Sequence, residues 1–188
     1  GVYDKLDAVG VDIARFGEDK TCFALRVGNV IVELRKYHKL DTMETTGLLA
    51  GLLRQRGGKA IVDVIGIGAG VVDRLYEQGF DILPFNAGSR TDRRDISGEV
   101  GFVDKRSAAW WNLREMLDPA SGIEIALPPD DDLVGDLTTP TWRLMSGGRL
   151  KVEAKDSIRR RLGHSTDAGD AVIQAFWSEP EPGAVGFF

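Results

Sequence analysis

Apolar runs separated by short polar turns dominate the first third of the chain. Residues 6–14, 21–27 and 30–37 are rich in Val, Ile and Leu, which is typical of strands. A polar loop over 15–19 separates the first two runs, and Gly28-Asn29 separates the last two. Both residues of that pair tolerate positive φ, so they suit a two-residue hairpin turn. The pattern predicts three strands paired as an antiparallel meander.

Helical and strand patterns then alternate. A helix is predicted over 41–56, because Asp41 can cap it and Glu44 completes a capping box. A short apolar strand over 60–65, a glycine-rich turn, a helix over 69–78 and a strand over 80–85 follow. The order β-β-β-α-β-α-β predicts an α/β fold, a mixed five-stranded sheet flanked by helices on both faces.

The second half of the chain is less regular. Residues 86–103 are polar and glycine-rich, which predicts a mobile loop or a small hairpin. The remaining predicted elements are a helix over 105–117, a strand over 123–127, a short helix over 131–139, a small extra hairpin over 141–152 that turns at Gly147-Gly148, and a final helix over 166–177 capped by Ser165. We expect a single domain over 1–178 and a flexible tail over 179–188.

Composition narrows the chemistry. Hydrophobic residues make up 43% of the 188, enough to bury a core. No apolar run approaches the roughly 18–20 residues that cross a membrane. One cysteine and two histidines exclude a Cys/His zinc cluster of ordinary spacing. The net charge of −5, taken alone, argues against a nucleic-acid partner.

Carboxylates inside apolar runs change that interpretation. Asp12 and Asp63 end strands predicted to be buried, and Asp170 precedes an apolar stretch of the last helix, with Asp167 on the same helical face. Clustered carboxylates favour a hard divalent cation, and two such ions promote phosphodiester cleavage. Two bound Mg²⁺ ions would bring the formal charge from −5 to −1. Taken singly, each aspartate could instead cap a turn or form a salt bridge with a basic side chain, and Asp167 could complement a helix N-terminus.

Four segments carry a resemblance to a known family. They are residues 11–21, which contain Asp12, residues 62–73, which contain Asp63, residues 104–111, and residues 155–171, which contain Asp167 and Asp170. Together they are similar to the C-terminal nuclease domain of the terminase large subunit, the DNA-packaging motor of tailed bacteriophages. The resemblance spans residues 6–177 and implies a ribonuclease H-like fold.

The resemblance implies roles for these carboxylates. Asp12, Asp63 and Asp170 would be catalytic residues and metal ligands, with Asp167 as a further ligand, and Asp19 as either an accessory ligand or a loop cap. The expected cofactor is Mg²⁺, two ions per site, with Mn²⁺ as a substitute. The expected activity is that of a DNA endonuclease that cuts concatemeric viral double-stranded DNA during packaging.

Basic clusters supply candidate DNA contacts, since phosphate binding relies on Lys and Arg. The residues selected are Arg90, Arg93, Arg94, Lys105 and Arg106. Residues 159–161 are three arginines that either contact phosphate or form a solvated face. The four tryptophans, Trp110, Trp111, Trp142 and Trp177, are interpreted as core residues and not as platforms for base stacking.

Two phosphate-binding motifs are excluded. Gly66, Gly68 and Gly70 follow a strand, but their spacing is not that of a dinucleotide fingerprint. The chain contains no G-x-x-x-x-G-K-[ST] loop, so the motor's ATPase is not part of it.

The expected partners are double-stranded DNA, the ATPase domain of the same large subunit, the portal protein and the small terminase subunit. We expect no membrane association, a monomeric isolated domain, and a location in the host cytoplasm during phage assembly. Two alternatives stay open: another ribonuclease H-like nuclease, such as a junction resolvase, and a non-catalytic docking module of the motor.

Overall fold

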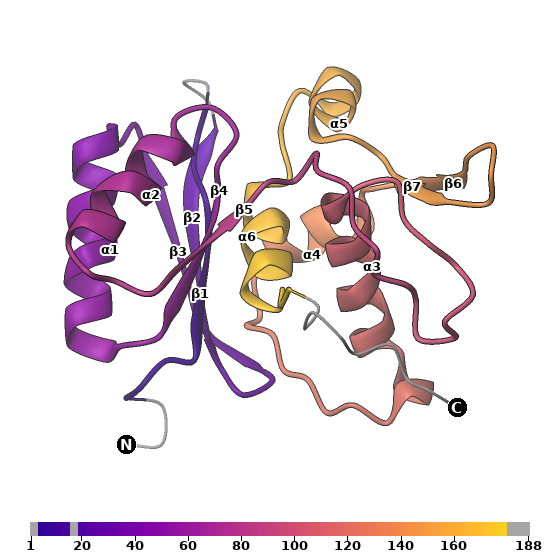
Figure 1. Cartoon of the computed structure of the whole chain (residues 1–188), viewed down its shortest axis with the longest axis horizontal. Helices are drawn as coiled ribbons and strands as arrows, with labels where there is room; N and C mark the ends of the chain where they lie inside the picture. The colour runs from indigo at the N-terminus through magenta and orange to yellow at the C-terminus, as the bar shows by residue number, and fades with distance from the viewer. Residues whose placement is uncertain (1–3, 16–18, 180–188) are drawn as a thin grey trace.

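A computed structural model describes residues 4–15 and 19–179, and the end of the expected tail, residues 180–188, lies outside the described residues. A five-stranded sheet stands between two sets of helices (Figure 1). The strand order is β3-β2-β1-β4-β5, with β1 antiparallel to β2 and parallel to β4. None of the described helices is long and apolar enough to cross a bilayer.

The sheet contains β1 (Ala8–Asp12), β2 (Lys20–Val27), β3 (Val30–His38), β4 (Lys59–Asp63) and β5 (Ile82–Phe85). Its two faces are covered by α1 (Thr42–Arg56), α2 (Gly68–Glu77), α3 (Lys105–Leu117), α4 (Asp131–Thr138) and α6 (Asp167–Ala175). The remaining elements are a 3₁₀ turn, η1 (Pro119–Ser121), the hairpin strands β6 (Trp142–Leu144) and β7 (Leu150–Val152), and α5 (Lys155–Leu162).

Local signals in the sequence explain several elements. The capping box of α1 is confirmed, since the Asp41 side chain accepts from the Glu44 N–H and the Glu44 side chain accepts from the Asp41 N–H. The turn at Gly28-Asn29 is confirmed too, with Gly28 at φ +56°. The predicted mixed five-stranded sheet and the extra hairpin are therefore both present.

Other expectations are wrong. The segment 123–127 forms only an isolated bridge from Ala126 to Val30, because the prolines 128 and 129 that follow lack the N–H groups a ladder needs. Ser165 does not cap the last helix, whose N-cap is Thr166, and that helix ends at Ala175. Helix α5 has no counterpart among the predicted elements.

The segment 86–103 contains a small hairpin over residues 94–101. Arg94 bridges Gly101, and the Asp95 carboxylate accepts the N–H groups of Glu99 and Val100. Phe102 at its end is fully buried in the core. The loop is thus tied to the body of the protein at both ends.

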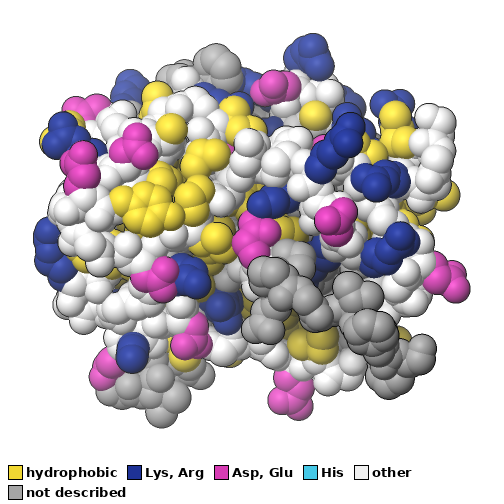
Figure 2. Space-filling model, in the orientation of Figure 1, with side chains coloured by type: hydrophobic (Ala, Val, Ile, Leu, Met, Phe, Trp, Pro, Cys, Tyr) yellow, Lys and Arg dark blue, Asp and Glu magenta, His cyan; other side chains and the backbone are white. Residues whose placement is uncertain are grey.

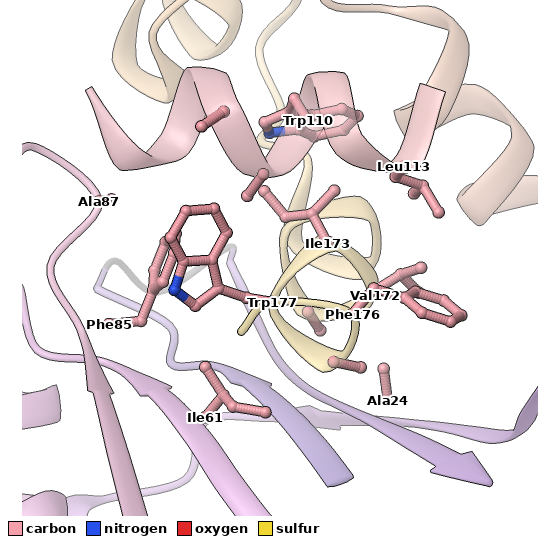
Figure 3. Close-up of a cluster of buried hydrophobic side chains, with 14 of the residues drawn as sticks. Ala24, Ile61, Phe85, Ala87, Trp110, Leu113, Val172, Ile173, Phe176 and Trp177 are labelled. Carbon is pink, nitrogen blue, oxygen red and sulfur yellow. The ribbon is translucent and has the colours of Figure 1, made fainter. Parts of the chain in front are cut away.

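The core has two parts, one on each face of the sheet. The part between the sheet and α1 and α2 is built from aliphatic side chains and Phe23. The other part surrounds α6, which lies between the sheet and α3, and it includes Trp110 and Trp177 (Figure 3). Trp142 is not a core residue, because 50% of it is exposed.

Gly10 determines how closely α6 approaches the sheet. A Cβ at this position of β1 would overlap the carbonyl oxygen of Ala171 and the backbone nitrogen of Ala175. The backbones of α6 and β1 are therefore in direct contact, and all nine residues of α6 are buried. This contact brings the acidic end of α6 close to the end of β1.

Candidate functional site

Asp12 and Asp63 end two neighbouring strands. β1 and β4 are parallel, with Val11 opposite Val62, so the following residue of each strand lies at the same edge of the sheet. Asp12 is only 3% exposed, at the end of a fully buried strand. The strand order β3-β2-β1-β4-β5 places β1 and β4 side by side at this edge.

Helix α6 supplies two more carboxylates, Asp167 and Asp170, from its first turn. The side chain of its N-cap residue makes no capping hydrogen bond, but the Asp136 carboxylate of α4 accepts the N–H groups of Gly169, at 3.0 Å, and Ala168. Asp136 thus satisfies N–H groups that a helix leaves open at its start. It also fixes the end of α6 that carries the carboxylates.

Lys155 lies among these carboxylates. Its Nζ is 2.6 Å from Asp12 Oδ2, 3.0 Å from Asp167 Oδ1 and 3.6 Å from Asp170 Oδ2. The residue begins α5, which follows directly on the hairpin strand β7. From the sequence alone, Lys155 is assigned no role. Only its position in the segment 155–171, which resembles the terminase family, could have drawn attention to it.

Two arginines approach the same site. Arg15 Nη2 is 3.5 Å from Asp63 Oδ2, and Arg106 Nε is 3.3 Å from Asp170 Oδ1. Asp170 is further held by Trp110 Nε1, which donates to Oδ1 at 3.0 Å, and by Thr166 Oγ1, which donates to Oδ2 at 2.8 Å. A cleft of about 180 Å³ opens beside these groups, lined by both arginines, Asp63, Asp170 and Lys155.

Burial and neighbouring charges shift the pKa values of the site residues in opposite directions. Burial raises the pKa of Asp12 well above its usual value, although Lys155 opposes this, and burial also raises the pKa of Asp63. For Asp170 the cost of burial is outweighed by Arg106 and Lys155, and its pKa is lowered. The three carboxylates raise the pKa of Lys155 against the effect of burial, so its ammonium stays charged.

Asp19 lies beside this group. Ser165 Oγ donates to Asp19 Oδ1 at 3.1 Å and also donates to Asp167. Arg159 Nη1 is 3.2 Å from Asp19 Oδ2. The Ser165 hydroxyl that was expected to cap α6 therefore joins two side-chain carboxylates.

The donor set suits a hard cation. Carboxylate oxygens are what Mg²⁺, Mn²⁺ and Ca²⁺ prefer, and here they already surround one cationic group, the Lys155 ammonium. Within residues 4–15 and 19–179, no three His, Cys, Asp or Glu side chains are arranged as a ready-made metal cluster. Asp12, Asp167 and Asp170 converge on the ammonium instead.

The predicted DNA-contact residues occupy different surroundings. Arg90 and Arg94 are exposed on the hairpin over 86–103. Arg93 is half-buried and lies over the ring of Trp177, with its Cζ 5.0 Å from the ring centroid.

Two of these residues belong to the start of α3. Lys105 pairs with Glu179, and Arg106 points inward to Asp170. Lys and Arg side chains also gather over α5 and toward the β6–β7 hairpin on the face that Figure 2 shows. The cations of α5 lie close to the carboxylates, because Lys155 begins that helix, whereas other exposed cations, such as Arg54 and Arg74, lie on α1 and α2.

Comparison of folds identifies similar solved structures. The chain resembles the nuclease domain of the large terminase subunit gp2 of bacterial virus Sf6, with a TM-score of 0.77 and 20% identity over 94% of this chain and 90% of that one. It also resembles the large terminase nuclease of the thermophilic phage G20c, with a TM-score of 0.67 and 16% identity over 94% and 84%. Neither a protein-family model nor a curated protein matches the sequence.

Divalent metals occur in several of these structures. Variants of the Sf6 domain were solved with calcium and with manganese, and the G20c nuclease with cobalt and with magnesium. The expectation about fold is confirmed: the chain has the ribonuclease H-like fold of phage large-terminase nuclease domains.

Proposed function

We propose that this chain is the metal-dependent nuclease domain of a phage packaging terminase and that it cuts double-stranded DNA. One observation carries the proposal. On a fold shared with terminase nuclease domains, Asp12 and Asp63 end neighbouring strands, Asp12, Asp167 and Asp170 surround Lys155, and Asp63 and Asp170 line one cleft. Buried carboxylates are costly for a fold, so such a group indicates chemistry.

The proposed ligands are Asp12, Asp63 and Asp170, with Asp167 and Asp19 as further candidates. When bound, two Mg²⁺ or Mn²⁺ ions would lower the pKa of a water molecule and stabilise the charge on the leaving oxygen. The protein holds the ligands in place through Trp110, Thr166 and Asp136. In the overall reaction, a water oxygen bonds to phosphorus, one P–O ester bond breaks, and the leaving oxygen gains a proton.

The proposal also covers the DNA contacts, the partner proteins and the place where the nuclease acts. Arg90 and Arg94 are exposed and suited to DNA phosphates, and residues 159–161 add three arginines on α5. By likeness to large terminase subunits, the partners are an ATPase domain of the same subunit, the portal protein and the small subunit. The site of action is the host cytoplasm, where the substrate is concatemeric viral DNA.

The test is cleavage of supercoiled plasmid with Mg²⁺, Mn²⁺, Ca²⁺ or EDTA. The native chain is compared with Asp12→Asn and Asp63→Asn, and with Asp73→Asn, an exposed aspartate of α2, as matched control. We expect Mg²⁺- or Mn²⁺-dependent nicking and linearisation that both site variants lose and the control keeps. A folded native protein that cleaves with neither metal would refute the proposal.

A further inference from the structure

The cleft beside the carboxylates contains two buried polar groups without hydrogen-bond partners among the described residues. One is the pair Nε and Nη2 of Arg106, and the other is Oε1 of Gln174. Both residues line the cleft, the Arg106 side chain being 11% exposed and Gln174 2%. Native proteins rarely leave such atoms unsatisfied, so an unmatched donor edge and acceptor in a cleft indicate a ligand.

The remaining contacts of Arg106 hold its plane in place. Nη1 donates to the carbonyl oxygen of Glu153, and the guanidinium lies over the Trp110 ring with Cζ 5.4 Å from the centroid. Nε lies 3.3 Å from Asp170, which keeps the positive charge at the carboxylate. Nε and Nη2 form one edge of the guanidinium, and such an edge matches two oxygens of a phosphate.

Gln174 supplies a hydrogen-bond acceptor, Oε1, in the same cleft as the Arg106 donors. It lies one helical turn after Asp170 on α6, so both side chains are on the same helical face. Its Oε1 can accept a hydrogen bond but carries no charge. A phosphate oxygen, which only accepts, suits the Arg106 edge, whereas Gln174 Oε1 suits a molecule that donates, such as water.

We propose that the Nε–Nη2 edge of Arg106, which faces Asp170 through Nε but has no hydrogen-bond partner among the described residues, binds the non-bridging oxygens of the scissile phosphate and that Gln174 orders a water molecule beside it. This inference rests on the proposed nuclease function and adds a catalytic residue to it. Arg106 donates hydrogen bonds and transfers no proton. A donor fixed where negative charge grows on phosphorus stabilises the transition state more than the bound substrate.

The test uses Arg106→Lys, which keeps the charge beside Asp170 but loses the two-donor edge. Its matched control is Arg54→Lys, since Arg54 lies over the Phe80 ring at 5.3 Å on the opposite side of the sheet. We expect plasmid cleavage at saturating DNA to fall by about 10²- to 10³-fold for Arg106→Lys. DNA affinity in Ca²⁺, Mn²⁺ affinity and the midpoint of thermal unfolding should match those of the control.

Other outcomes overturn the inference. Cleavage at the native rate means that the edge is not used, and a parallel loss of Mn²⁺ affinity means that Arg106 acts only through Asp170. If the native chain itself does not cleave, the nuclease proposal fails separately. Binding of a short duplex in Ca²⁺ then decides: Arg106→Gln should lower the slope of log affinity against log salt by about one, and an unchanged slope rejects the phosphate contact.

Discussion

The two faces of the central sheet are built on different principles. The face under α1 and α2 is covered by aliphatic side chains and Phe23, with no buried carboxylate among the residues that the structure describes. Open space surrounds Gly47 and Gly51 of α1. On the other face, α6 touches the backbone of β1 and carries two carboxylates among apolar and aromatic side chains, where Lys155 of α5 pairs with them. One face gives stability by burying apolar area, whereas the other holds charges in place at a cost.

Removal of Lys155 should give the largest effect. Without metal, Lys155→Ala leaves Asp12, Asp167 and Asp170 without the ammonium between them. Breaking a buried ion pair costs about 3–5 kcal/mol, so the free energy of unfolding in EDTA should fall by about that amount. Ca²⁺ should then raise the midpoint of thermal unfolding more in the variant than in the native chain, because the ammonium no longer competes.

The control on the opposite face is Leu49→Ala in α1, where Leu49 is fully buried. It should cost about 2–5 kcal/mol through lost apolar contact and a cavity. Its response to Ca²⁺ should equal that of the native chain. A Ca²⁺ response enlarged equally in both variants would show that the two faces do not differ as described.

A methyl group at Gly10 tests the backbone contact of α6 with the sheet. Gly10→Ala should lower the free energy of unfolding by about 3 kcal/mol, because the Cβ overlaps backbone atoms that cannot rotate away. Gly47→Ala, in open space on α1, should instead stabilise the protein by about 0.5–1 kcal/mol. Urea denaturation of both variants measures the two changes in the free energy of unfolding. Equal changes would contradict the described packing.

The pH dependence of Asp136 gives a smaller effect. Burial, reinforced by Asp170 and Asp167, raises its pKa to about 6 from the usual value near 3.8. The native state therefore binds a proton more readily than the unfolded chain between about pH 4 and 6, and this contribution to stability is lost as pH rises through that window.

Asp136→Asn removes this titration and keeps an acceptor for the N–H groups of α6. In EDTA, the free energy of unfolding of the variant relative to the native chain should rise by up to about 3 kcal/mol between pH 4 and 7. Urea denaturation across this range measures the difference. Curves that run parallel at every pH would mean that Asp136 is not the group that titrates.

Much of the sheet could be predicted from sequence because its signals are local. The alternation of apolar runs and turns predicts the meander. The ribonuclease H-like fold that the resemblance implies sets the first and fourth strands side by side, which brings Asp12 and Asp63 together. Lys155 could not be found this way, because α5 has only Ile158 buried and its charged residues show no apolar periodicity.

Long-range pairing explains the other errors. Ser165 precedes a helix in the manner of a cap, but its hydroxyl bonds to Asp19 and Asp167. The cap comes from Asp136, more than 30 residues away in sequence, which no local pattern can reveal. Arg106 likewise resembles a surface cation in sequence, and only the tertiary fold turns it toward Asp170.

The placement of α6 between the sheet and α3 has a consequence for synthesis. Asp12 and the strands of the sheet are made before Asp170 and the helix that carries it. At roughly 5–20 residues per second, the strands are complete several seconds before α6 can dock on β1. The full carboxylate cluster therefore forms only after α6 has been made and has docked on β1.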